Sequence, residues 1–150
     1  MRISVIGGSR IDESGERIAT AVGRAVASRG HTLVCGGLGG TMAAACRGAS
    51  EAGGRTIGIV PGEDPGTANE FVTVPIATGL GHQRNALVVL NGDGVVALPG
   101  GAGTLSELGF AGIYERPVAG IDTHDVPGVH PVEDPEAAVT YLEEAVPDEG

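Results

Sequence analysis

The sequence contains no lysine: all nine of its basic side chains are arginines, and nineteen acidic residues give the 150-residue chain a formal net charge of −10. Without lysine the chain cannot form a Schiff base with pyridoxal phosphate, use a lysine nucleophile or build a Walker A loop. Aromatic residues make up only 3%, and tryptophan is absent. An acidic chain with few aromatic side chains lacks the cationic surface and the stacking platforms of nucleic-acid binders, so we expect no nucleic-acid partner.

Cysteines and long apolar runs are also scarce. The two cysteines, Cys35 and Cys46, lack CxxC spacing, which predicts a reduced, buried pair. The histidines match no zinc motif, and although acidic and histidine side chains share the loop 122–130, we expect no metal site. No stretch approaches the roughly 18 apolar residues that cross a bilayer, and the N-terminus lacks the features of a signal peptide. We therefore expect a cytoplasmic protein with no membrane partner.

Length and composition indicate one globular domain. Hydrophobic residues make up 41% of the chain, enough for one core, so a single domain is expected over residues 1–150, with a flexible tail at 146–150. A lysine-free, acidic surface is also typical of proteins that work in strong salt, where screening shortens the range of self-repulsion. The hypothesis of a halophilic protein predicts a melting temperature that rises between low and molar salt.

Short apolar runs bounded by glycine or proline alternate with helical patterns. Buried strands are predicted at residues 3–6, 32–35, 56–60, 71–76, 95–98 and 118–121, and helices at 14–29, 42–52, 83–90, 105–114 and 135 to about 146. This alternation predicts a doubly wound α/β fold, with a mostly parallel sheet covered by helices on both faces. Val5, Val34, Ile59, Val96 and Leu98 are expected in its core.

Three of the predicted strands run directly into glycine-rich turns, at residues 7–10, 36–42 and 99–104. Glycines let backbone N–H groups approach an anion, and a helix that starts at once adds the positive end of its dipole. Ligands of parallel sheets bind at this edge, so three such turns favour a phosphorylated small molecule, although any one turn is also a plain tight connection. The NAD fingerprint does not fit, because the first turn lacks GxGxxG and the second strand ends at Cys35 instead of an acidic residue.

The predicted phosphate- or nucleotide-binding residues come from these turns. They are Gly8, Ser9, Arg10, Gly36, Gly37, Gly40, Met42, Gly100, Gly101, Ala102, Gly103 and Thr104. The backbone N–H groups of residues 100–104 are expected to be the main donors, since a molecule at −10 gains nothing from long-range attraction of an anion. Arg10 fits a phosphate contact and a solvated position equally well.

Two of these turns contain motifs that resemble those of a known protein family. Residues 99–107 read PGGxGTxxE and residues 36–42 read GGxxGxM. Together they resemble the LOG-type proteins, the cytokinin-activating phosphoribohydrolases often mislabelled lysine decarboxylases, and the related molybdenum cofactor carrier proteins, over roughly residues 2–121. The resemblance implies a Rossmann-like domain, usually a homodimer, that binds a nucleoside 5′-monophosphate through the first of these motifs without a metal or organic cofactor. It also implies that Arg84 and Glu107 are the catalytic residues.

The chemistry of these two side chains is consistent with that role. Cleavage of an N-glycosidic bond gives the ribose oxocarbenium character, which a carboxylate such as Glu107 stabilises while it orients or deprotonates water. Arg84 supplies fixed donors to a phosphate or ribose oxygen. The alternatives are a capping box, in which Glu107 bonds back to the Thr104 N–H, and a surface position for Arg84.

The resemblance leaves two functions open. The hydrolases typically carry Arg-Lys where this chain has Arg84-Asn85, and Arg-Asn before an apolar helix is more similar to the carrier branch. The chain is therefore either a phosphoribohydrolase or a non-catalytic protein that binds a nucleotide or molybdenum cofactor.

Two further expectations concern His82 and the homodimer. His82 either lines the pocket or begins a helix. For the homodimer, the helix faces at 43–49 and 110–114 are the expected contacts.

Overall fold

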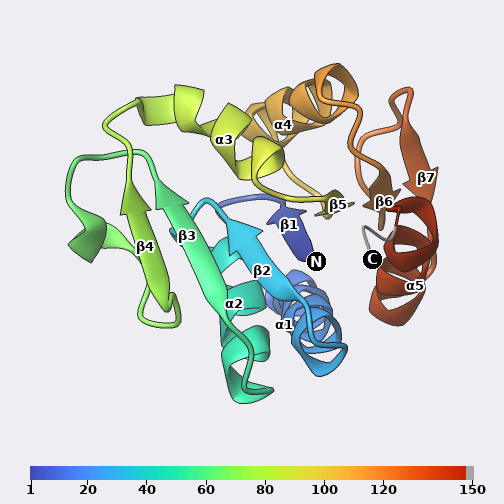
Figure 1. Cartoon of the computed structure of the whole chain (residues 1–150), viewed down its shortest axis with the longest axis horizontal. Helices are drawn as coiled ribbons and strands as arrows, with labels where there is room; N and C mark the ends of the chain where they lie inside the picture. The colour runs from blue at the N-terminus through green and yellow to red at the C-terminus, as the bar shows by residue number, and fades with distance from the viewer. Residues whose placement is uncertain (148–150) are drawn as a thin grey trace.

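The computed structural model describes residues 1–147, which form one β-sheet between two layers of helices (Figure 1). The strands are β1 (Arg2–Ile6), β2 (Thr32–Cys35), β3 (Thr56–Val60), β4 (Val74–Ala77), β5 (Gly94–Ala97), β6 (Val118–Gly120) and β7 (Val129–Pro131). The helices are α1 (Glu13–Ser28), α2 (Thr41–Glu51), α3 (Asn85–Leu90), α4 (Ala102–Ile113) and α5 (Pro135–Ala145), with 3₁₀ turns at Pro65–Thr67 and Gly81–Arg84. Part of the expected tail, residues 148–150, lies outside the described residues.

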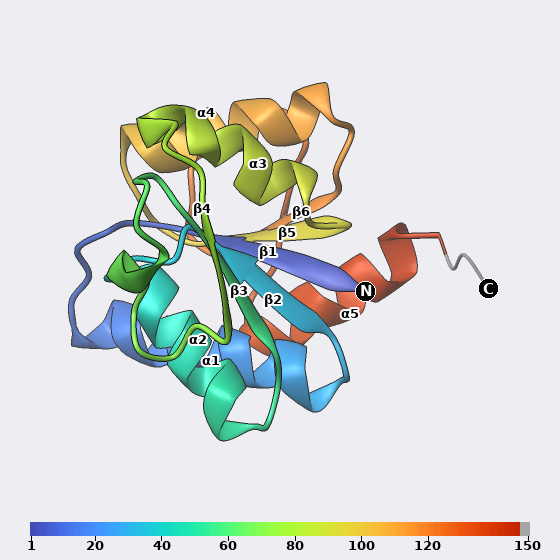
Figure 2. The same ribbon diagram turned by 60° about the vertical axis from the view of Figure 1, so that its left-hand side comes forward.

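The strands lie in the order β4-β3-β2-β1-β5-β6-β7, and every neighbouring pair is parallel. Helices α1, α2 and α5 cover one face, and α3 and α4 cover the other (Figure 2). Because both faces are covered, the central strands are buried and mostly apolar. The five residues expected in the core, Val5, Val34, Ile59, Val96 and Leu98, are at most 2% exposed. The predicted Rossmann-like α/β fold is confirmed.

The two edge strands differ from the sequence prediction. Residues 71–76 were expected to form a buried strand, but β4 begins at Val74, lies at the edge of the sheet and has all four of its residues exposed. At the other edge, β7 was not predicted. It has three residues, Val129–Pro131, and ends in a proline that only an edge strand tolerates, so it carries almost no strand pattern.

Helices α1 and α2 pack with their backbones in near contact. A Cβ added to Gly23 would lie 1.9 Å from the Ala45 carbonyl oxygen, and one added to Gly48 would lie 1.9 Å from the Thr20 oxygen. The small residues of 43–49 thus pack within the chain, so the expectation that this face contacts a second subunit is wrong.

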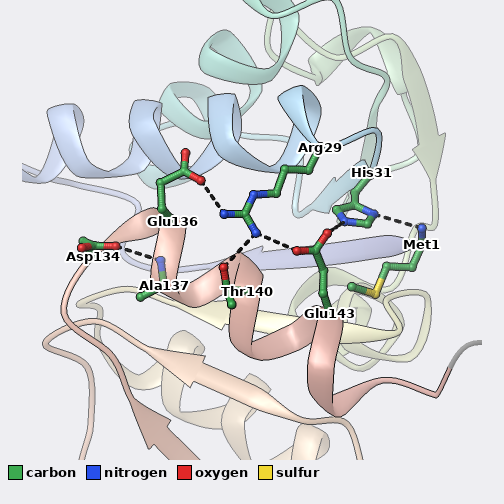
Figure 3. A network of polar contacts seen from close by, with 8 residues as sticks. All are labelled: Met1, Arg29, His31, Asp134, Glu136, Ala137, Thr140 and Glu143. Atoms are coloured by element: carbon green, nitrogen blue, oxygen red, sulfur yellow. Dashed lines mark hydrogen bonds and ion pairs between the residues drawn. The ribbon is translucent and has the colours of Figure 1, made fainter.

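An exposed ion-pair network attaches α5 to the rest of the chain (Figure 3). Arg29, at the end of α1, lies 2.6 Å from Glu143 and 2.8 Å from Glu136, and it also donates to Thr140. The His31 ring contacts the other Glu143 oxygen at 2.9 Å. The network lies beside the amino-terminal end of β2, away from the edge of the sheet where the glycine-rich turns lie. In the described part of the chain, no helix is long and apolar enough to cross a membrane.

Candidate functional site

A cavity of about 490 Å³ lies at the carboxyl ends of the central strands, between the glycine-rich turns and the 3₁₀ turn that precedes α3. It is lined by most of the predicted site residues: Gly8, Ser9, Gly36, Met42, Arg84, Gly101, Ala102, Gly103, Thr104 and Glu107. His82 also lines the cavity, which is one of the two positions that the sequence analysis allowed for it. The three turns thus meet at one place, because parallel strands end at the same edge.

The other predicted site residues lie beside or beneath this cavity. Gly40 has a φ of 62°, and a Cβ there would lie 2.5 Å from the Ser9 carbonyl oxygen. A Cβ on Gly100 would lie 2.0 Å from the Thr104 hydroxyl, and one on Gly37 would lie 2.8 Å from a Val60 methyl group. These three glycines permit the close packing of the turns. Arg10 lines a neighbouring cavity and does not meet the Arg84 side of the site.

Two helices begin at the cavity without a side-chain cap. Helix α4 starts after Gly101 and α2 after Gly40, and neither has a side chain that accepts from the first turn. The N–H groups of residues 102–104 find no protein acceptor within residues 1–147. Unpaired N–H groups at the positive end of a helix dipole have the donors and the charge that favour an anion such as phosphate.

Arg84 is buried, with 8% of the residue exposed, and is held by the backbone. Its Nε donates to the Ile59 carbonyl oxygen at 2.9 Å, and one Nη lies 3.4 Å from the Gly36 oxygen. The other Nη donates to the Asn85 side chain. A guanidinium has five N–H donors, so donors remain for a ligand after these three contacts. The alternative of a surface cation is wrong.

Asn85 is a site residue whose role the sequence analysis missed. Its Oδ1 accepts from Arg84, and its Nδ2 donates to the Ser106 hydroxyl at 3.1 Å. Ser106 in turn donates to the Gly103 carbonyl oxygen at 2.6 Å. The chain of contacts fixes the guanidinium relative to the first turn of α4. The departure from Arg-Lys marked this position in the sequence, but only the fold brings it beside Ser106.

Glu107 lies on α4, 8% exposed, with its carboxyl at the cavity. Burial raises its pKa to about 8, against the opposing effect of the Arg84 charge. Within the described residues, burial and the nearby Arg84 charge are the influences on this carboxyl, and no hydrogen bond contributes to its pKa. The capping box does not form, because the helix begins at Ala102, which makes Thr104 part of its first turn instead of its cap.

The cysteine pair lies under the second glycine-rich turn. The Cys35 and Cys46 sulfurs are 3.4 Å apart, and both residues are buried and free. The hydrogen bond with Cys46, together with burial, raises the pKa of Cys35 well above its usual range. The prediction of a reduced, buried pair is confirmed.

The chain is similar in sequence and structure to several known proteins. A model of the SLOG cluster4 family matches residues 1–147. An uncharacterised protein of Archaeoglobus fulgidus is 40% identical over 142 residues, which cover 94% of this chain and 93% of that protein. A cytokinin riboside 5′-monophosphate phosphoribohydrolase of Mycobacterium tuberculosis is 33% identical over 114 residues, 70% of this chain and 61% of that protein. Among solved structures, the molybdenum cofactor binding protein of Rippkaea orientalis superposes with a TM-score of 0.90 at 31% identity, covering 97% of both chains.

Proposed function

Because the chain belongs to the SLOG cluster4 family, we propose that it binds a nucleoside 5′-monophosphate and hydrolyses the bond between base and ribose, releasing the free base and ribose 5-phosphate. The observation that carries this proposal is the buried, unpaired Glu107 carboxyl in a cavity that Arg84 shares. A carboxyl buried without a partner costs stability, so a purely structural helix gains nothing from it.

The phosphate binds at the start of α4. The free N–H groups of residues 102–104 converge there, and no acidic residue lies in the first turn of the helix to compete with the ligand. The remaining donors of Arg84 bind a phosphate or ribose oxygen, and its contacts with Ile59 and Asn85 hold it in place before the ligand arrives. The ribose then lies between Arg84 and Glu107.

The raised pKa gives Glu107 a role as an acid in addition to the role of a carboxylate. At neutral pH its carboxyl is mostly protonated, since its pKa is about 8. When the N-glycosidic bond breaks, its electron pair goes to the base nitrogen, and Glu107 donates the proton that neutralises it. The carboxylate that forms stabilises the oxocarbenium ion and takes a proton from the water that adds to C1′. Glu107 thereby returns to its starting state.

The test is release of free base from a panel of nucleoside monophosphates, measured with wild type and Glu107→Gln. Glutamine keeps the size of the side chain but can neither donate this proton nor become a carboxylate. Base release should fall at least about a hundredfold, with the affinity for the monophosphate nearly unchanged, because the interaction forms only in the transition state. The wild-type rate should decline above pH 8, as Glu107 loses its proton.

Full activity of Glu107→Gln contradicts the catalytic assignment. If wild type binds a monophosphate tightly and releases no base from any, hydrolysis is wrong, and the second function stands: non-catalytic binding of a nucleotide or of molybdenum cofactor. Two observations favour this alternative, the Asn85 that replaces the lysine of the hydrolases and the close superposition on a molybdenum cofactor binding protein.

The proposal includes a homodimer. With 43–49 packed inside the chain, the remaining expected surface is the end of α4, where Ile113 is 70% exposed beside the half-buried Phe110 and Tyr114. Light scattering at micromolar concentration in high salt should give the mass of two chains. A monomer mass would contradict the dimer and leave the ligand proposal unchanged.

A further inference from the structure

A second cavity, of about 570 Å³, adjoins the site on the side of α1. The two cavities share Gly8, Ser9 and Gly101, which form a ridge between them. The ridge joins the turns after β1 and β5, where the Gly8 N–H donates to the Pro99 carbonyl oxygen at 2.8 Å. This is the point where the strand order reverses, at which doubly wound sheets bind ligands that extend across the sheet.

The ridge carries almost no side chains. Of its three shared residues only Ser9 has one, and a Cβ placed on Gly101 would meet no atom within 4 Å. The uncapped start of α4 forms the end of the ridge, so a phosphate bound there is open to both cavities. A ligand whose phosphate carries a second substituent therefore has a path from one cavity into the other.

The lining of the second cavity favours an uncharged ring with polar substituents. Ile11, Ile18 and Leu98 give it apolar surface. Asp122, and the Asp12 oxygen that does not cap α1, accept hydrogen bonds from hydroxyl or amino groups, and both carboxylates repel a free phosphate. A sugar or a nucleoside fits both the apolar surface and the carboxylate acceptors, since carboxylates bind ribose hydroxyls in many nucleotide sites.

Arg10 gains a role in this arrangement. It lines the second cavity beside Ser9 and the glycines of the ridge, and it is the one arginine there. An arginine next to the ridge suits the further negative charge of a second phosphate, which the start of α4 alone would leave unmatched.

We infer that the ligand is a nucleoside diphosphate ester, with one nucleoside in the cavity of Arg84 and Glu107, its diphosphate on the ridge, and an uncharged sugar or second nucleoside in the cavity lined by Ile18 and Asp122. This inference rests on the proposed function, because it uses the same phosphate position. It extends that function by naming a larger ligand than a monophosphate.

The test compares the affinities of adenosine monophosphate, adenosine diphosphate and adenosine diphosphate ribose by calorimetry. The ribose ester should bind at least about tenfold more tightly than either of the other two. Ser14→Trp fills the second cavity from the first turn of α1, and it should reduce the affinity for the ester to that for the diphosphate, without changing the affinity for the monophosphate. Arg17→Trp is the matched control, since this residue lies on the same helix but lines a different surface.

A second variant tests the polar contacts. Asp122 has a φ of 50°, a conformation that asparagine tolerates, so Asp122→Asn keeps the backbone and removes the carboxylate charge. It should weaken the ester and leave the monophosphate unchanged. Equal affinities for all three ligands overturn the inference while the proposed function stands. Weaker monophosphate binding in Ser14→Trp also overturns it, because the base itself would then occupy the second cavity. If wild type binds none of the three and no other nucleoside monophosphate, both proposals are wrong.

Discussion

Helices α1 and α5 begin differently from helices α2 and α4, although all four start at the same edge of the sheet. The first pair begins with an aspartate: Asp12 accepts from the Gly15 N–H at 2.8 Å, and Asp134 accepts from the Ala137 N–H at 2.8 Å. The second pair begins with Gly40 and Gly101, which have no side chain to offer.

The charges follow the same division. Acidic residues lie in the first turns of α1 and α5, at Glu13, Glu16 and Glu136, and there are none in the first turns of α2 and α4. In α1 and α5, side chains of the protein satisfy the first N–H groups and the dipole. Where they do not, the helix start is available to an external anion.

The variant expected to have the largest effect gives α4 the kind of start that α1 has. In Gly101→Asp the new carboxylate enters open space, accepts from the first-turn N–H groups and repels a phosphate. Nucleotide affinity should fall at least about a hundredfold, while the free energy of unfolding rises by about a few tenths of a kcal/mol. Calorimetry and urea denaturation measure the two effects.

Gly109→Asp is the matched control for Gly101→Asp. It adds the same charge to an exposed position farther along α4, where a Cβ also meets no atom within 4 Å. Its nucleotide affinity should equal that of wild type. Unchanged affinity in Gly101→Asp would place the phosphate away from this helix start.

A second difference lies in the acidic residues themselves: those of α1 are exposed, whereas Glu107 of α4 is buried. Burial raises its pKa from 4.5 to about 8, so the folded state binds this proton more tightly than the unfolded state. Its contribution to stability is complete below pH 4.5 and is lost as pH rises through 8. Since each pKa unit corresponds to about 1.4 kcal/mol, the loss should reach a few kcal/mol.

Glu107→Gln removes this dependence. Its free energy of unfolding should exceed that of wild type at pH 9 by more than at pH 5, as measured by urea denaturation. Glu70→Gln, at an exposed position, serves as the control. A difference between Glu107→Gln and wild type that is the same at both pH values would show that Glu107 is not held protonated.

The elements that sequence predicted correctly are those whose pattern is set by burial. Val5 and Val96 lie in strands covered on both faces, and such strands read as unbroken apolar runs. Prediction failed at the edges, where β4 has the composition of a buried strand and Pro131 conceals β7. The start of α4 was placed three residues late, because Ala102 and Gly103 belong to the glycine-rich motif as well as to the helix.

The same limit applies to the site. The glycine-rich turns predicted which residues line the cavity, since their spacing is local. The contacts of Arg84 with Ile59 and of Asn85 with Ser106 join segments that are far apart in sequence, so no local pattern contains them. The acidic state of Glu107 is likewise a property of burial by the whole fold. The homodimer, the salt dependence and the cytoplasmic location stay predictions.

The smallest expected effect comes from removing a cap at a helix start that serves only the fold. Asp134→Ala leaves the Ala137 N–H without its acceptor and should lower the free energy of unfolding by about 1 kcal/mol. Asp134→Asn, which keeps a capping oxygen, should lose only a fraction of that. Both variants should bind the nucleotide as wild type does, because Asp134 lines neither cavity of the site. Urea denaturation measures the stability, and calorimetry on the same preparations measures the nucleotide affinity. A loss of nucleotide affinity in Asp134→Ala would show that a capped helix start also contributes to ligand binding.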